Sequence, residues 1–219
     1  MKAIVISLLC AGALLLSGCM PSIKSEAELY SWLANPENGL VKNRNVAGVA
    51  LSARYLPPAY LAFRELKSAS PQERIAQGDS VLNTYRGSYT FLLRLGPDDA
   101  AGEQFNIQEL GVENLEEYRD QTYTLNFDLA PDFSLRTGKG ALQPVSASME
   151  NIYGLSNSRT IYLVFSPATQ QEAQILAEAS ELDLVYTDRL FDTGIHHFTF
   201  ESEAVYNIPS FEFRNLSAS

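Results

Sequence analysis

Cysteine is almost missing from this chain, which has two in 219 residues, Cys10 and Cys19. Both lie near the N-terminus, so residues 20–219 carry no thiol at all. This excludes an internal disulfide, thiol redox chemistry, a cysteine nucleophile and a zinc–thiolate site from that part of the chain. Its core must be stabilised by burial alone, which a chain of this size can manage.

Basic residues and catalytic motifs are also scarce. Lys and Arg number 16 against 26 Asp and Glu, which gives a formal net charge of −10. A chain this acidic is a poor ligand for nucleic acid and for anionic lipid headgroups, because both need clustered cations. The sequence contains no G-x-S-x-G, no H-E-x-x-H, no phosphate-binding G-K-[ST] loop and no G-x-G-x-x-G after a strand. We therefore expect a non-enzymatic protein without a cofactor.

The longest apolar run is residues 3–16, which follows Lys2. Its 14 residues are too few to cross a hydrocarbon core, which takes about 20. Length and flanks are typical of the apolar region of a cleaved signal peptide.

The run ends in Leu16-Ser17-Gly18-Cys19, which resembles the lipobox of bacterial lipoproteins. The resemblance implies cleavage after Gly18, acylation of Cys19 and attachment of the mature chain to the lipid bilayer. Two or more acyl chains anchor a protein stably, whereas one gives only marginal binding. Met20 follows the cysteine, and under the sorting rule of enteric-type lipoproteins this implies the outer membrane, facing either the periplasm or the exterior.

The expected organisation is therefore a signal peptide over residues 1–18, a lipidated tether over 19–24 and a single α+β domain over 25–219. Removal of residues 1–18 takes away one lysine and no acid, so the remaining 201 residues carry a net charge of −11. Residues 20–24 reach at most about 17 Å, which keeps the domain close to the bilayer.

Helices are predicted where capping residues precede apolar periodicity. Ser25-x-x-Glu28 and Ser70-Pro71-x-Glu73 are capping-box patterns, and Thr169-x-x-Glu172 is a third. Residues 60–66 fit either a helix or a strand. The helices are expected at 25–34, 70–86, 112–120 and 168–180.

Strands are predicted where apolar residues alternate with polar ones between turn signals. The expected strands are 49–55, 89–95, 123–129, 133–136, 142–151, 159–165, 182–186, 195–201 and 210–213. The sequence thus predicts an α+β fold with a helical N-terminal third packed on an antiparallel β-sandwich. Residues 25–100 would form its α/β N-terminal part and residues 105–219 would be mainly β-sandwich.

His196 and His197 are the only histidines, and neighbours on a strand point to opposite faces. We expect one to be partly buried and hydrogen-bonded and the other to lie at the surface, so neither is assigned a catalytic or metal role. Asp183, Asp188 and Asp192 lack the dense spacing of a calcium loop, and a turn with Asx hydrogen bonds is expected instead.

Aromatic residues and prolines concentrate where the strand at 49–55 must stop. Exposed tyrosine and proline would make a rigid contact surface for a partner protein. The alternative is that the aromatic side chains close the core beneath the turn. The residues concerned are Tyr55, Pro57, Pro58, Tyr60 and Phe63.

The functional expectation is a structural or accessory lipoprotein that binds an envelope protein and no nucleic acid. A module that binds a glycan or another small ligand is the alternative. A hydrolase is a further alternative, and it would need a histidine beside a carboxylate and a serine hydroxyl in a cleft.

Overall fold

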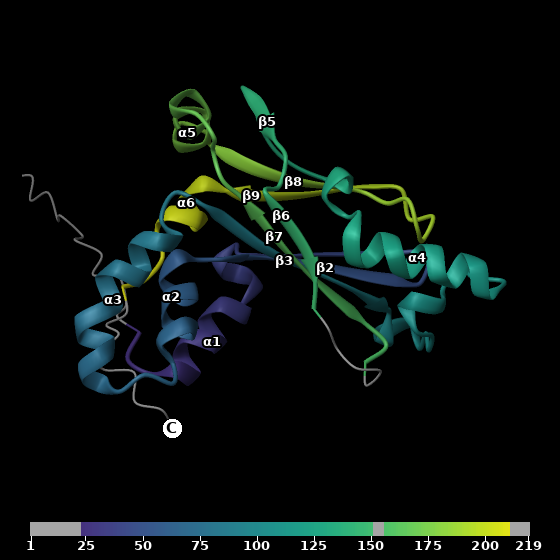
Figure 1. Ribbon diagram of the computed structural model, residues 1–219, viewed down its shortest axis with the longest axis horizontal. Coiled ribbons are helices and arrows are strands. Elements are labelled where there is room, and N and C mark those ends of the chain that lie inside the picture. The colour runs from purple at the N-terminus through teal and green to yellow at the C-terminus, as the bar shows by residue number, and fades with distance from the viewer. Residues whose placement is uncertain (1–22, 151–155, 211–219) are drawn as a thin grey trace, which may run out of the picture.

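The computed structural model describes residues 23–150 and 156–210 (Figure 1). The signal peptide, Cys19, most of the tether and all but the first residue of the strand expected at 210–213 lie outside these ranges. Within them the chain forms helices and two antiparallel sheets, which confirms the α+β class.

The first sheet has five strands in the order β1-β2-β3-β7-β6. Buried and partly exposed side chains alternate along its inner strands, as expected for a sheet with one face in the core. The outermost strand on one side, β1, is mostly exposed and was not predicted, because its central residues Lys42 to Asn45 are all polar. The strands are β1 Val41–Val46, β2 Val49–Leu56, β3 Tyr89–Pro97, β7 Arg159–Phe165 and β6 Ser146–Met149.

The second sheet has four strands in the order β5-β4-β8-β9. The sequence predicts one strand over residues 142–151, but the described part of that segment contains the last residue of β5 and the whole of β6, which belong to different sheets. The strands are β5 Gly140–Leu142, β4 Phe133–Thr137, β8 Glu181–Thr187 and β9 Ile195–Glu201.

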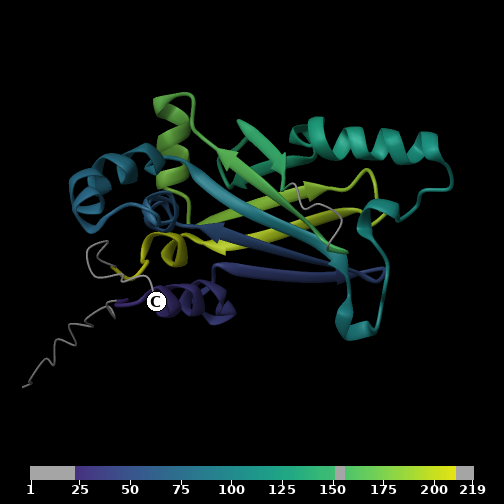
Figure 2. The same cartoon turned by 60° about the horizontal axis from the view of Figure 1, so that its bottom comes forward.

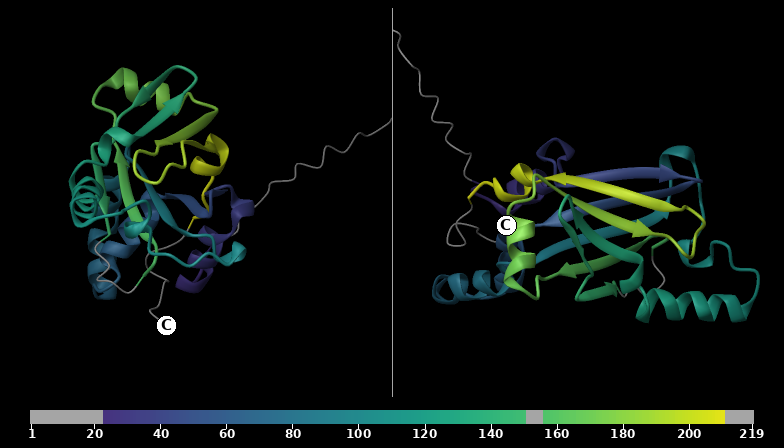
Figure 3. Two further views of the ribbon diagram at one scale, coloured as in Figure 1. Left: turned by 90° about the vertical axis from the view of Figure 1, so that its right-hand side faces the viewer. Right: turned by 90° about the horizontal axis from the view of Figure 1, so that it is seen from above.

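The two sheets lie against one another (Figure 3), and residues of both belong to one hydrophobic core. The ring of Phe91 on β3 lies 5.2 Å from that of Phe200 on β9 and 6.0 Å from that of Phe165 on β7, measured between centroids. Apolar side chains from the two sheets therefore pack against one another, an arrangement compatible with the expected sandwich.

Three helices of the N-terminal part gather at one end of the sheets, together with a short helix that follows β9 (Figures 1 and 2). Ser70 and Glu73 form the predicted capping box, whereas Ser25 caps its helix while Glu28 accepts from the N–H of Lys24 instead. Residues 25–100 also supply β1, β2 and β3, so they are not a purely helical layer. The helices are α1 Glu26–Ala34, α2 Pro58–Leu66, α3 Pro71–Tyr85 and α6 Ser202–Tyr206.

The opposite end of the molecule carries α4, Leu115–Phe127 (Figures 1 and 2). The helix predicted at 112–120 is present but runs on to Phe127, so the strand predicted at 123–129 is wrong. Asn114 caps the helix by accepting from the N–H groups of Glu116 and Glu117, and no proline or glycine interrupts the chain before Pro131. The helix consequently continues through the segment whose alternation resembles a strand.

Short elements complete the chain. Thr169 caps α5, Gln170–Ala177, as predicted, and residues 60–66 belong to a helix rather than a strand. The 3₁₀ helices are η1 Pro36–Asn38, η2 Asp99–Ala101, η3 Ile107–Glu109 and η4 Ala130–Asp132. Within the described residues, no helix combines the length and the apolar character needed to cross a bilayer.

Candidate functional sites

The two histidines point to opposite faces of β9, as predicted. His196 is buried, its ring is stacked between those of Tyr186 and Phe198, and its Nε2 lies 2.9 Å from Thr193 Oγ1. Burial lowers the pKa of His196, so the imidazole is neutral near pH 7. This residue is a satisfied core histidine.

His197 is exposed, and its Nδ1 lies 2.7 Å from Asp183 Oδ2 on the neighbouring strand β8. The pair resembles two members of a catalytic triad. Among the described residues no serine hydroxyl bonds to the ring of His197, and neither His197 nor His196 lines the best-formed pockets. The arrangement is a surface pair between strands and gives no support to a hydrolase.

Asp188 organises the turn between β8 and β9. Its two carboxylate oxygens accept hydrogen bonds from the N–H groups of Leu190, Phe191 and Thr193, and also from the hydroxyls of Thr193 and Tyr186. The carboxylate is thus occupied by the loop itself, which confirms the expected Asx-type turn. In the parts of the chain described here, no group of three or more His, Cys, Asp or Glu residues is placed to hold a metal ion.

The aromatic and proline segment does not form the exposed contact surface considered above. Tyr55, Tyr60 and Phe63 are buried in the core, and Pro57 is buried too. Pro58 occupies the first turn of α2, a position that suits proline, and the helix carries Tyr60 and Phe63 inward at a three-residue spacing. The alternative, that these rings close the core beneath the turn, is confirmed.

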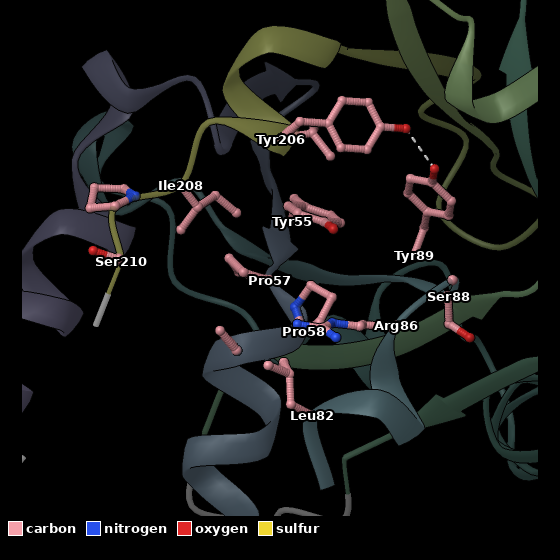
Figure 4. A pocket seen from close by; sticks show the side chains of 14 residues that line it. Tyr55, Pro57, Pro58, Leu82, Arg86, Ser88, Tyr89, Tyr206, Ile208 and Ser210 are labelled. Atoms are coloured by element: carbon pink, nitrogen blue, oxygen red, sulfur yellow. Dashed lines mark hydrogen bonds between the residues drawn. The ribbon is translucent and has the colours of Figure 1, made fainter. Parts of the chain in front are cut away.

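Part of the same segment lines a pocket of about 390 Å³ at the end of the molecule where α1, α2, α3 and α6 gather (Figure 4). Three stretches far apart in the sequence form its wall: the β2–α2 junction, the end of α3 with the start of β3, and the chain from α6 to Ser210. The wall is mostly apolar. Its lining consists of Tyr55, Pro57, Pro58, Ala59, Leu82, Arg86, Gly87, Ser88, Tyr89, Val205, Tyr206, Ile208, Pro209 and Ser210.

Three tyrosines surround this pocket. The hydroxyls of Tyr89 and Tyr206 lie 2.6 Å apart, and Tyr206 also donates to the carbonyl of Leu176 at 3.2 Å (Figure 4). Tyr55 is 3% exposed and lines the same pocket, and its hydroxyl forms no hydrogen bond with another described residue. Burial raises the pKa of Tyr55 and of Tyr89, so both stay protonated at physiological pH.

A second surface lies on α4, at the far end from this pocket (Figures 1 and 2). Leu115, Tyr123 and Phe127 are 82%, 63% and 77% exposed, and the rings of Tyr123 and Phe127 lie 5.3 Å apart. These positions are spaced by multiples of four residues, so they form one ridge along the helix. We call these three residues the α4 ridge. A large apolar ridge left in solvent marks an interaction surface more often than it occurs by chance.

The sequence prediction missed both surfaces. For α4, the signal was present in Asn114-x-x-Glu117, a capping pattern at the true start of the helix. For the pocket no local signal exists, since Arg86 and Tyr206 meet Tyr55 only when the chain folds.

No family model and no curated protein matches the chain. Among solved structures, a protein of unknown function from Burkholderia pseudomallei is similar, at 12% sequence identity and a TM-score of 0.37. The alignment covers 87% of this chain and 90% of that one. A likeness this weak says nothing about what the present chain does.

Proposed function

We propose that the mature chain is an outer-membrane lipoprotein, anchored through acylated Cys19, that acts as a non-enzymatic accessory subunit. It binds an envelope protein through the α4 ridge. The observation that carries the proposal is the uncovered apolar ridge at the end of the molecule opposite α1, the helix that follows the tether (Figure 2).

Alternating apolar residues on a helix divide between two opposite faces, because a step of two residues turns the chain by about 200°. Leu125 is buried in the core on one side of α4, while Tyr123 and Phe127 remain in solvent on the other. Tyr123 and Phe127 are therefore not needed to fill the core. Their exposure supports the assignment of a docking surface.

A protein partner suits the ridge better than the bilayer does. The tether joins the fold at Ile23, beside α1, so the short tether holds that end at the membrane and directs α4 away from it. Acidic side chains also accompany the ridge, and anionic headgroups repel them. They are Glu113, Glu116, Glu117 and Asp120, against the single cation Arg119.

The partner's chemistry follows from this composition. An amphipathic helix is typically bound in an apolar groove of the partner, which contacts side chains at helical spacing. Because acidic residues flank the α4 ridge, we expect basic residues at the rim of that groove. Leu115 to Phe127 spans about 18 Å of helix. Burial of Leu or Phe contributes about 1.5–3 kcal/mol each, and because association itself costs free energy, the basic rim must add to the affinity.

The test is affinity purification of the full lipidated chain from solubilised envelopes, with Leu115→Glu and Phe127→Glu compared with wild type. We expect a stoichiometric partner with wild type and at least a tenfold loss of it with either variant, at unchanged melting temperature. Ile75→Glu is the matched control, since Ile75 is also a half-exposed apolar residue on a helix, at the other end of the molecule. Recovery of the chain alone, or equal recovery by all three variants, would contradict the proposal.

The anchor is tested separately by Cys19→Ala. We expect this variant to leave the membrane fraction or to accumulate as an uncleaved precursor, because the acyl chains supply the membrane affinity. Membrane association that survives in a correctly cleaved Cys19→Ala chain would refute the anchor and leave the α4 ridge untouched.

A further inference from the structure

We propose that the pocket between the β2–α2 junction, the end of α3 and the segment after α6 binds a small amphiphile with one apolar chain and an anionic head, of the fatty-acid class. This ligand site lies at the opposite end of the molecule from the α4 ridge and is independent of it (Figures 1 and 4).

The apolar wall and the volume define the body of the ligand. Leu82, Val205 and Ile208 line the pocket together with Tyr55 and Pro57. A volume of about 390 Å³ is near the lower end of the range of roughly 300–1,000 Å³ for ligand pockets. It accommodates one short apolar chain and not a whole two-chain lipid.

The charge of the lining defines the head. Arg86 is the only charged residue among the fourteen that form the wall, and no acid is present there. Asp and Glu outnumber Lys and Arg in the whole chain, 26 to 16. A pocket lining with one cation and no acid therefore has the opposite charge balance to the chain as a whole. Arg86 donates to Asn83 Oδ1 at 2.8 Å and has no acidic partner within the described residues, which leaves its remaining donors available to a carboxylate.

Tyr55 supplies a second polar group that the fold itself does not use. It is buried, yet its hydroxyl faces the space enclosed by the wall, as the close view shows (Figure 4). The hydroxyls of Tyr89 and Tyr206 are hydrogen-bonded to each other at 2.6 Å. The hydroxyl of Tyr55 has no hydrogen bond to any residue in the described part of the chain. This hydroxyl can therefore donate a hydrogen bond to a ligand oxygen without breaking a bond within the fold.

The test uses the full lipidated chain in phosphatidylcholine nanodiscs, with protein-free nanodiscs subtracted. Calorimetric titration with hexanoate, octanoate, decanoate and decylamine gives the dissociation constants. Each added methylene should tighten binding roughly fourfold until the pocket is full, after which the gain stops. Decanoate should bind at least tenfold more tightly than decylamine, which has the same chain and the opposite charge.

Variants assign the site. Arg86→Glu should weaken decanoate at least tenfold and favour decylamine, while Arg86→Lys should retain most of the wild-type preference. Tyr55→Phe keeps the buried ring and should weaken decanoate several-fold through loss of the hydroxyl alone. Arg119→Glu, an equal charge change at an exposed position on α4, should leave every constant unchanged.

Three results would overturn the inference: no binding above the protein-free nanodiscs, equal affinity for decanoate and decylamine, or an Arg86→Glu chain that folds and still binds decanoate as wild type does. Loss of the envelope partner on the α4 ridge would not alter any of these outcomes.

Discussion

Asp188 concentrates more hydrogen bonds on one side chain than any other turn residue described here, and it does so while partly buried. Burial alone would raise the pKa of this carboxyl, but the donors of Thr193, Leu190 and Phe191 hold it below its usual value. The ionised form is therefore part of the folded state.

Asp188→Asn should destabilise the fold by about 2 kcal/mol at pH 7, because hydrogen bonds to a charged group are lost and an amide N–H₂ meets other donors. A depressed folded-state pKa contributes stability above the unfolded value of about 4 and loses it as the pH falls through the folded value. The difference in unfolding free energy between wild type and variant should accordingly shrink below about pH 4, as urea titrations across pH would measure.

The control for this prediction is Asp192→Asn in the same turn. Asp192 is exposed with a φ of +56°, a conformation that asparagine tolerates, so the same charge change should move stability by less than about 0.5 kcal/mol. Equal destabilisation by the two variants would show that charge in the turn matters and the Asp188 hydrogen bonds do not.

Gly96 marks the closest approach of β3 to the chain that leads into β7. A Cβ added there would lie 2.6 Å from Ser158 Cβ and 3.2 Å from Ser158 Cα. Gly96→Ala should therefore cost about 1–3 kcal/mol by overpacking, measured by chemical denaturation. Gly138→Ala has open space around it and should be neutral. A neutral Gly96→Ala would mean that the two segments are further apart than described.

At the residue scale, the sequence was a good guide where chemistry is local. The split between His196 and His197 follows from strand alternation, and the turn at Asp188 follows from its own side-chain oxygens. The role of Tyr55 was not predictable, because its burial depends on α6 and on α3, which follow it by 150 and by fifteen or more residues.

Among the elements, α3 is the one whose start is most strongly specified. Ser70 Oγ accepts from the N–H of Glu73 while Glu73 Oε2 accepts from the N–H of Ser70. Ser70→Ala removes one side of this reciprocal pair and should cost about 1 kcal/mol in thermal or urea unfolding. Ser80→Ala, an exposed position within the same helix, should be neutral or slightly stabilising. If Ser70→Ala and Ser80→Ala lowered the unfolding free energy equally, the loss would not come from the capping hydrogen bonds.

Element types were predicted correctly where capping or alternation was unambiguous, as for α1, α3, β2, β7 and β9. The prediction failed for the second half of α4, where the alternation of apolar residues resembles a strand, and for β1, whose central residues are polar. In both cases tertiary contacts decide the structure. All six residues of β1 pair with β2, and the buried side chain of Leu125 packs α4 against the core.

At the scale of the whole molecule, the two sheets and the N-terminal helices depend on one another. β3 pairs with β2 on one side and with β7, more than sixty residues later, on the other, and Phe91 contacts Phe200 across the core. The N-terminal part therefore lacks half of its sheet without the C-terminal part. We expect a single unfolding transition by near- and far-ultraviolet circular dichroism, and two separate transitions would show independent domains.

The pocket and the α4 ridge lie at opposite ends of the molecule. α1, which begins three residues after the first described residue, and the pocket lie at the end formed by α1, α2, α3 and α6, while the α4 ridge lies at the other (Figure 2). With the anchor that we propose at Cys19, this layout would suit a protein that connects a membrane to a partner.

That central claim is tested most directly by a photo-cross-linking phenylalanine analogue placed at Phe127 in living cells, with the same analogue at Ile75 as the reference. The account predicts one discrete adduct in the envelope fraction from position 127, none from position 75, and loss of the adduct when Leu115→Glu is added to the same chain. An absence of adduct at 127, or the same adduct from both positions, would contradict it.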